Sequence, residues 1–258
     1  MNPVGRSLVV LYGVGGLSDV GRHAILAALD RPEVQKITVI TEYPEKLDET
    51  NWECGCPDGH TNPLNDENFQ NRLEMVKIDT WKKPQENLAK HFKGVDGVIS
   101  CLGHRQPGFK YKELITKGLV AHEGNKQVIS AMEEAKIDRA VVISSFALRG
   151  ENSWPHFASK IMRVLFATFM RKARDDLVAM EEAYEASSLD YLFVRPVGIS
   201  EEAVPVGKYF LQDPNNSTDL VGGDMAKMDV GRFMVDQALE PTLHKTSQTV
   251  GAEPGTGF

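Results

Sequence analysis

The sequence predicts an α/β fold, a doubly wound parallel sheet of six or seven strands with helices on both faces. Short apolar, β-branched runs alternate with longer segments of helical periodicity along the chain. Most of these runs are nearly continuous in apolar residues, which is typical of strands covered on both faces. Strand–helix alternation of this kind implies right-handed crossovers between parallel strands. We therefore predict a Rossmann fold with the strand order 3-2-1-4-5-6.

Six runs are assigned as strands, and a seventh strand is expected near Gln248–Val250. The six are Leu8–Tyr12, Ile37–Thr41, Met75–Ile78, Gly97–Cys101, Ala140–Ser144 and Tyr191–Arg195. Helical periodicity is found at Asp19–Asp30, Lys112–Ala135 and 158–186. A polar insertion at 48–71 and a loop-rich segment at 196–223 interrupt this alternation. Because open α/β sheets bind ligands beyond the carboxyl ends of their strands, the segment at 196–223 is expected on the substrate side.

Length and composition narrow the classes of function. No repeat, and no linker rich in Pro, Gly or Ser, divides the 258 residues, so we expect a single domain, 1–258. The net charge is −7 and no run of Lys and Arg marks one face, which argues against a nucleic-acid partner. The longest apolar candidate for a membrane span, Ile161–Met170, contains Arg163, so no membrane partner is expected. With no signal-peptide pattern and three cysteines, we expect a cytoplasmic protein, monomeric or dimeric.

A glycine-rich turn joins the first predicted strand to a helix that contains Gly21. Glycines let a diphosphate approach the backbone without a Cβ in the way, and the helix N-terminus offers unpaired N–H groups. This context, at the start of a βαβ run, predicts a dinucleotide-binding turn. The spacing departs from GxxGxxG, because either two residues are inserted after Gly16 or Ser18 stands where a glycine is usual. The residues expected to contact the cofactor here are Gly13, Gly15, Gly16, Leu17, Ser18, Asp19 and Val20.

The second predicted strand ends where a dinucleotide would place its adenosine ribose. Glu42 follows Gly21 by 21 positions, close to the offset of ~20 residues at which an acidic side chain binds ribose hydroxyls. A carboxylate accepts hydrogen bonds from a 2′-hydroxyl and repels a 2′-phosphate, so Glu42 favours NAD. Lys46 and Arg22 could instead clamp a phosphate, and a solvated surface glutamate is the simpler alternative.

Six segments, taken in order, carry a family resemblance. They are ITVITEYPEKL, VKID, VDGVISCLG, EGNKQVISAMEEAKIDRAVVISS, DDLVAMEEAYEASSLDYLFVRPVGIS and GGDMAKMDVGRFMVDQAL. Together they resemble the atypical short-chain dehydrogenases/reductases, in particular the NmrA-like group that includes biliverdin-IXβ (flavin) reductase. The resemblance implies an NAD(P)(H) cofactor and leans to NADP, although Glu42 stands where NADP-binding members usually carry Arg. The further cofactor-binding residues that it implies are Asp79, Cys101, Leu102, Gly103, Ser144, Pro196 and Val197.

The wider superfamily uses a Ser–Tyr–Lys set for proton transfer, and this chain departs from it. Ser145 matches the serine, but the nearest match to Tyr-x-x-x-Lys is His156 with Lys160. One hypothesis makes His156 the general acid, since imidazole titrates near neutral pH, and places Lys160 on the ribose. The alternative is that this match is coincidental and that residues 154–170 form an apolar wall or lid, with the substrate protonated from water.

Two further groups of polar residues could have a functional role, but each group also has a simpler explanation. Asp176 and Glu181 resemble an acidic pair of the family, and Glu181 with Glu182 invites an acid–base role, but several carboxylates on one helix usually form a solvated face. The second group lies within the polar insertion and consists of Cys54, Cys56 and His60. These residues could be ligands of a metal site, but their spacing favours a flexible insertion.

The residues together predict an NAD(P)-dependent oxidoreductase that transfers a hydride to or from a small carbonyl or conjugated substrate, which the family likeness implies is planar or aromatic. The substrate is expected between the nicotinamide and walls from 104–111, 151–175 and 196–223. One alternative is a non-catalytic NAD(P)-binding redox sensor that reports to a protein partner, which the missing tyrosine favours. Another is an NAD-retaining isomerase or epimerase.

Overall fold

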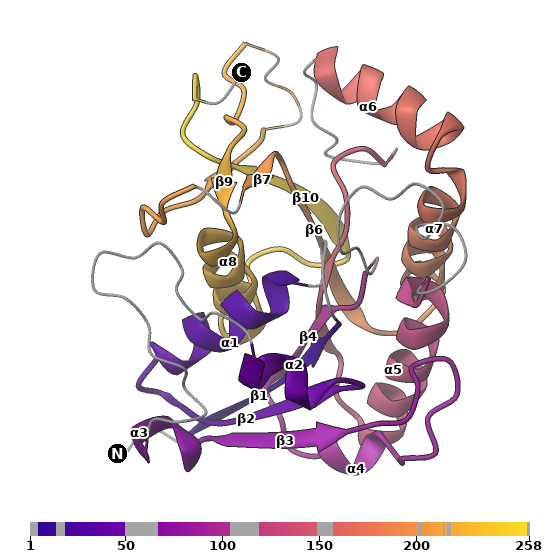
Figure 1. Ribbon diagram of the computed structural model, residues 1–258, viewed down its shortest axis with the longest axis vertical. Coiled ribbons are helices and arrows are strands. Elements are labelled where there is room, and N and C mark those ends of the chain that lie inside the picture. Colours follow the sequence, from indigo (N-terminus) through magenta and orange to yellow (C-terminus); the bar gives the residue numbers. More distant parts are fainter. Residues whose placement is uncertain are drawn as a thin grey trace.

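Eight strands form the central sheet of the computed structural model, in the order β3-β2-β1-β4-β5-β6-β10-β8 (Figure 1). The structure describes residues 5–13, 19–49, 67–103, 119–148, 157–200, 203–213, 215 and 218–256. Neighbouring strands are parallel except β10 and β8, which are antiparallel. The predicted Rossmann order is therefore confirmed, and the predicted seventh strand is β10, Thr246–Gly251. The sequence did not predict the edge strand β8, Phe210–Leu211.

The six predicted strands are all present, with small differences at their ends. They are β1 Arg6–Tyr12, β2 Val34–Thr41, β3 Leu73–Lys77, β4 Gly97–Cys101, β5 Arg139–Ile143 and β6 Asp190–Pro196. Strand β4 has the predicted bounds, whereas Ile78 and Ser144, predicted as strand residues, each lie one residue beyond a strand. A separate two-stranded sheet pairs β7, Ile199–Ser200, with β9, Met225–Ala226.

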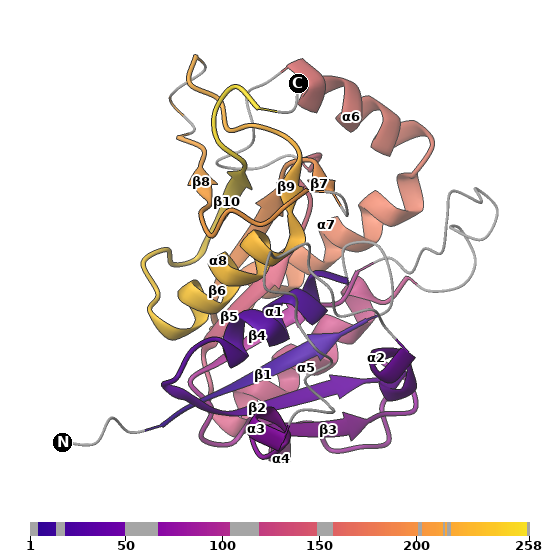
Figure 2. The same cartoon turned by 60° about the vertical axis from the view of Figure 1, so that its left-hand side comes forward.

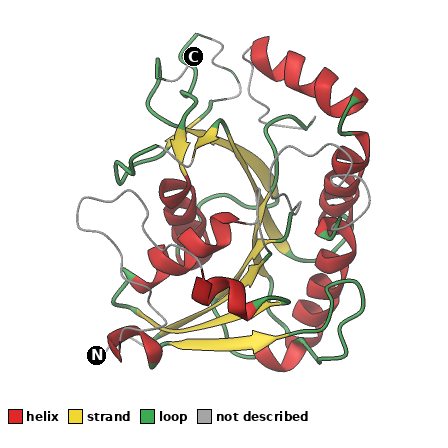
Figure 3. Ribbon diagram, in the orientation of Figure 1, coloured by secondary structure: helices red, strands yellow, loops and turns green. Residues whose placement is uncertain are grey.

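Helices cover both faces of the sheet (Figure 3). On one face α1 packs against α8, and on the other α5 packs against α4 and α7. Alternate residues of β1 join these two layers: Leu8 and Val10 belong to the core beneath α1 and α8, and Val9 to the core beneath α5 and α7. This two-sided burial explains the continuous apolar runs. The helices are α1 Val20–Leu29, α2 Pro44–Glu49, α3 Glu67–Gln70, α4 Ala89–Phe92, α5 Ala121–Ala135, α6 Phe157–Thr168, α7 Arg171–Glu185 and α8 Lys227–Leu239.

The single helix predicted over 158–186 is wrong, because the chain forms two helices there. Both Phe169 N–H and Met170 N–H donate to the carbonyl of Leu165, at 2.8 and 3.3 Å, and Met170 leaves the helical conformation with φ −119° and ψ 30°. Helix α7 then lies in the layer with α5, while α6 runs along the outer edge of the molecule (Figures 1 and 2). Neither Gly nor Pro marks this break, so helical periodicity alone does not reveal it.

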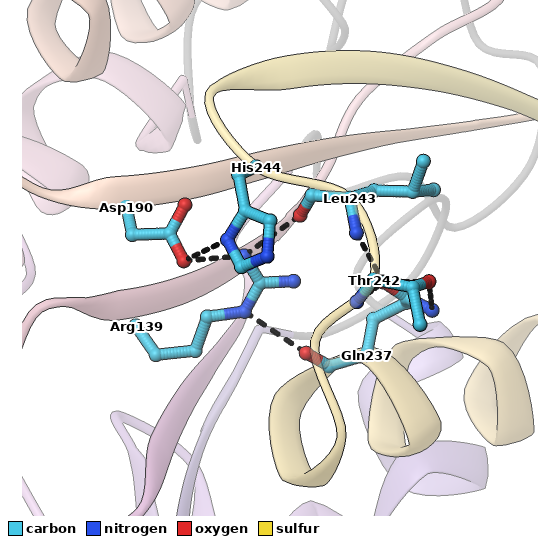
Figure 4. A network of polar contacts seen from close by, with 6 residues as sticks. All are labelled: Arg139, Asp190, Gln237, Thr242, Leu243 and His244. Atoms are coloured by element: carbon cyan, nitrogen blue, oxygen red, sulfur yellow. Dashed lines mark hydrogen bonds and ion pairs between the residues drawn. The ribbon is translucent and has the colours of Figure 1, made fainter.

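A polar network closes the amino ends of β5 and β6 (Figure 4). The guanidinium of Arg139 donates to the carboxylate of Asp190 at 3.0 Å and to the backbone carbonyls of Gln237 and Leu243 at 2.9 and 3.0 Å. His244 Nδ1 lies 2.8 Å from the same Asp190 carboxylate. The network ties the end of α8 and the start of β10 to the central strands, at the end of the sheet opposite the candidate site.

Candidate cofactor site

The candidate site lies where the chain leaves β1 and β4 at their carboxyl ends. Tyr12, the last residue of β1, pairs with Cys101, the last residue of β4. Gly13 continues from β1, and buried Leu102 and Gly103 continue from β4. Because crossovers leave β1 in opposite directions on its two sides, this is the topological switch point at which such sheets bind nucleotides. Four of the predicted turn residues lie outside the described residues: Gly15, Gly16, Leu17 and Ser18.

Gly21 sets how closely α1 approaches the sheet. A Cβ at this position would lie 3.0 Å from Cδ2 of Tyr12 and 3.1 Å from Cβ of Cys101, tighter than most real contacts. The absence of a side chain at Gly21 therefore lets α1 pack closely on β1 and β4. Cys101 is fully buried beneath α1, and burial raises the pKa of its thiol far above the ordinary value. Its side chain fills space under the helix, while its backbone borders the site.

Opposite charges meet where α1 begins. Asp19, the residue before Val20 at the helix start, accepts a hydrogen bond from Nζ of Lys227 at 2.6 Å and another from Arg22 at 3.2 Å. Burial disfavours the charged form of Asp19, but Arg22 and Lys227 outweigh it and hold its pKa below the ordinary value. Two cations thus share one carboxylate at the positive end of the helix dipole, which suits a diphosphate. Lys227 is the first residue of α8, so its ion pair with Asp19 joins the start of α8 to the start of α1.

The N-terminus of α5 already has an anionic partner. The carboxylate of Asp176, on α7, accepts hydrogen bonds from the backbone N–H groups of Ala121 at 3.0 Å and His122 at 3.2 Å. An acidic side chain at a helix N-terminus satisfies the amides and the dipole that would otherwise attract a phosphate. The first amides of α5 are therefore already occupied by Asp176. Asp176, which resembles an acidic residue of the family, therefore binds the start of α5 in this structure.

Glu42 is buried directly after β2, so the alternative of a solvated surface glutamate is wrong. Its Oε1 accepts a hydrogen bond of 2.7 Å from the backbone N–H of Trp81, in the segment that follows β3. That segment also carries Asp79, which is exposed and accepts a hydrogen bond from the N–H of Gln85. This hydrogen bond lowers the pKa of Asp79. The pairing of β2 with β3 thus brings Glu42 and Asp79 to one end of the sheet, as expected for an adenosine site, while the side chain of Lys46 lies outside the described residues.

Ser144 and Ser145 follow β5 and are both buried. The hydroxyl of Ser144 donates to Oε1 of Glu181 at 2.6 Å, and Glu181 is also held by Arg195 of β6, with Nη2–Oε2 at 2.7 Å and Nε–Oε1 at 3.2 Å. The interpretation of Glu181 as part of a solvated face is therefore wrong, although Glu182 is exposed. A carboxylate held this way fixes the positions of the Ser144 hydroxyl and the Arg195 guanidinium. Sequence reasoning missed Arg195, whose signal was a charged residue inside the buried strand LFVRP, because such a charge needs a buried counter-charge.

The remaining predicted residues are placed in part. Pro196 ends β6, and buried Val197 donates its N–H to the carbonyl of Val250 at 2.8 Å, so both lie at the carboxyl end of the sheet. Lys160 is exposed on α6, and the position of His156 lies outside the described residues. The possible metal ligands in the insertion also lie outside them: Cys54, Cys56 and His60. Among the residues that are described, no cluster of three or more His, Cys, Asp or Glu could hold a metal ion.

A parallel sheet with this order, and a glycine turn before a helix at its switch point, defines a dinucleotide-binding protein of the Rossmann type. A family model described as NAD(P)H-binding matches residues 60–241, and the chain belongs to this family. The match begins after the glycine-rich turn, so the assignment does not depend on the irregular glycine spacing. No curated protein matches the sequence.

Three solved structures illustrate the fold that the chain shares. A short-chain dehydrogenase/reductase from Veillonella parvula, in complex with NADP, is 15% identical, with 98% of this chain and 97% of that chain covered and a TM-score of 0.66. ChuY, an anaerobilin reductase from Escherichia coli, is 19% identical over 98% and 99%, with a TM-score of 0.64. A putative NAD-dependent epimerase/dehydratase from Bacillus halodurans is 16% identical over 97% and 96%, with a TM-score of 0.63. At these identities the likeness shows the fold.

Proposed function

We propose that the chain is an NAD(P)-dependent oxidoreductase of the atypical short-chain dehydrogenase type, acting on a small carbonyl or conjugated substrate. The observation that carries the proposal is the set of residues at the carboxyl ends of β1, β4, β5 and β6. The start of α1, with Asp19 between Arg22 and Lys227, suits the diphosphate. A bound nicotinamide would supply or accept the hydride, and Ser144–Ser145 and Pro196–Val197 would flank it.

Ser145 is the residue we place on the substrate oxygen. It follows Ser144, whose hydroxyl and backbone N–H are both held, the first by Glu181 and the second by the carbonyl of Val194 at 2.7 Å. The Ser145 Oγ accepts a hydrogen bond from the N–H of Ala147 at 3.2 Å, so its O–H can donate to a substrate oxygen. His156 remains the hypothesis for proton delivery, with water as the alternative, whereas Lys160 is exposed on α6.

We further propose that Glu42 makes NAD the preferred coenzyme. Its buried carboxylate is fixed by Trp81 at the end of β2, where a 2′-phosphate would be repelled. Replacing Glu42 by Gln removes the charge and keeps an acceptor for Trp81. We expect Glu42→Gln to tighten NADPH binding roughly tenfold and to change NADH binding little, measured by titration calorimetry. Glu45→Gln, an exposed position on α2, is the matched control and should alter neither affinity.

The absence of a tyrosine in the Tyr-x-x-x-Lys position favours the alternative of a non-catalytic sensor. A measurement of turnover separates this sensor from the proposed enzyme. Oxidation of NADH and NADPH should be followed with a panel of quinones, flavins and aldehydes. Hydride transfer to any of them, reduced at least tenfold by Ser145→Ala, supports the oxidoreductase. Tight coenzyme binding with no turnover on the whole panel would instead support the sensor.

A further inference from the structure

Helix α6 carries apolar side chains on the face that points away from the protein. Ser159 and Phe166 are buried on its inner face. Positions three and four residues apart share one side of a helix, and on the outer side of α6 they are large and apolar. The exposed apolar residues of this outer face, and of the turn after it, are Phe157, Ile161, Val164, Leu165 and Phe169. An apolar helix face of this size is normally covered, by the protein itself or by a partner, but on α6 it is exposed.

The charge around this helix is opposite in sign to that of the whole chain. Between Asn152 and Arg174 there is no Asp or Glu, although the chain has 36 acidic and 29 basic residues. Asp175 pairs with Arg174 and Arg171, and Asp176 is turned toward α5. Two lysines near this helix are exposed, Lys160 on α6 and Lys172 on α7. Within the described residues, no carboxylate lies within ion-pair distance of either lysine.

We propose that α6 is a docking helix that lies on the surface of a bilayer containing anionic lipid. Amphipathic helices of this kind bury an apolar face at the headgroup boundary and place Lys and Arg among anionic headgroups. None of the described helices combines the length and apolar composition needed to cross a bilayer. An interfacial helix lies on a bilayer without crossing it, so it needs no membrane-spanning segment.

The position of α6 and its charges favour a lipid surface over a second copy of the chain. Helix α6 lies at the outer edge of the molecule in both views, where a flat surface can reach it (Figures 1 and 2). Pairing two copies through this face would bring the unpaired lysines of each copy together. A second exposed apolar segment, with Val204 and Val206, borders a cavity of about 390 Å³. The charged residues that line this cavity are three carboxylates and one lysine: Asp224, Asp229, Glu253 and Lys208. That acidic surrounding does not suit anionic lipid, so the inference is confined to α6.

Flotation of the full chain with vesicles tests this inference. Vesicles of phosphatidylcholine alone are compared with vesicles that contain about one-third phosphatidylserine. We expect binding to the anionic vesicles only, weakened at least tenfold by Val164→Glu, because this charge would enter the apolar boundary. Val206→Glu is the matched control: these valines are 62% and 66% exposed, and the control should bind as the unchanged chain does. Circular dichroism and thermal unfolding check that both variants fold.

Three results would overturn the proposal. The first is failure of the folded full chain to float with anionic vesicles, and the second is flotation that Val164→Glu leaves unchanged. The third is a sedimentation measurement in which the chain is a dimer that Val164→Glu converts to a monomer, because the outer face would then contact a second copy. Lys172→Glu should weaken flotation roughly five- to tenfold, and Lys172→Arg should preserve it. None of these readouts requires turnover, so the inference stands or falls separately from the proposed activity.

Discussion

Buried arginines lie at both ends of the central sheet, and their surroundings differ. At the amino end, Arg139 is bound by two backbone carbonyls and by Asp190, a carboxylate that is partly exposed (Figure 4). At the carboxyl end, Arg195 forms a bidentate ion pair with Glu181, and both side chains are buried. The first network ties elements together, whereas the second also holds the hydroxyl of Ser144 beside the candidate site. Disrupting the network at the amino end should therefore lower stability alone. Disrupting the network at the carboxyl end should lower both stability and coenzyme binding.

The largest expected effect is that of Glu181→Ala. This change leaves the guanidinium of Arg195 buried without its carboxylate, and breaking a buried ion pair in this way costs about 3–5 kcal/mol in the free energy of unfolding. Coenzyme binding should weaken as well, because Ser144 loses its acceptor. Urea unfolding and calorimetry measure the two effects. Glu182→Ala is the control on the exposed side of α7 and should stay within about 0.5 kcal/mol of the unchanged chain.

Arg139→Ala tests the amino end of the sheet. It removes three hydrogen bonds, but Asp190 keeps His244 and contact with solvent, so we expect a smaller loss of about 2–3 kcal/mol in the free energy of unfolding. The dissociation constants of NADH and NADPH should not change. A fall in coenzyme affinity in the folded variant would contradict the division between a structural and a binding end of the sheet.

The same contrast shows what the sequence could and could not predict. The continuous apolar strands predicted a sheet covered on both faces, because such burial leaves a direct mark on composition, and their alternation with helices led to the Rossmann strand order. The role of Glu181 was hidden, since carboxylates in a row on a helix resemble a solvated face and only the fold brings Arg195 against it. The break at Met170 and the two-residue strand β8 were also hidden, because both depend on tertiary packing.

Gly21→Ala sharpens the comparison within the carboxyl end. The added Cβ would meet Tyr12 and Cys101 at about 3 Å and push α1 away from β1 and β4. Overpacking of this kind lowers the free energy of unfolding by about 1–3 kcal/mol, and displacement of α1 should also weaken coenzyme binding. Denaturant unfolding with and without NADH separates the two effects. Unchanged stability and affinity would show that α1 does not need this close approach.

Asp19→Asn should change how stability depends on pH. The pKa of Asp19 in the folded chain lies below its ordinary value of 3.8, so its ionised form adds stability above that value. This contribution is lost as the pH falls below about 4, through the lower pKa of the folded chain. The variant should be less stable by about 1–2 kcal/mol at neutral pH and should lose less on acidification. Thermal unfolding between neutral and acidic pH measures both curves, and parallel curves would argue against the predicted contribution of Asp19.

Asp176→Ala should give the smallest change, and it separates the roles of two carboxylates of α7, partly buried Asp176 and buried Glu181. Asp176 caps the first turn of α5, whereas Glu181 reaches Ser144 at the candidate site. Loss of a cap lowers the free energy of unfolding by about 1 kcal/mol, and the freed amides should then be hydrated. We expect the stability of the folded chain to fall by this amount in urea, with coenzyme affinity unchanged. Asp176→Ala could instead weaken coenzyme binding as much as we expect of Glu181→Ala. That result would place the start of α5 in the binding site, and the diphosphate would no longer be assigned to α1 alone.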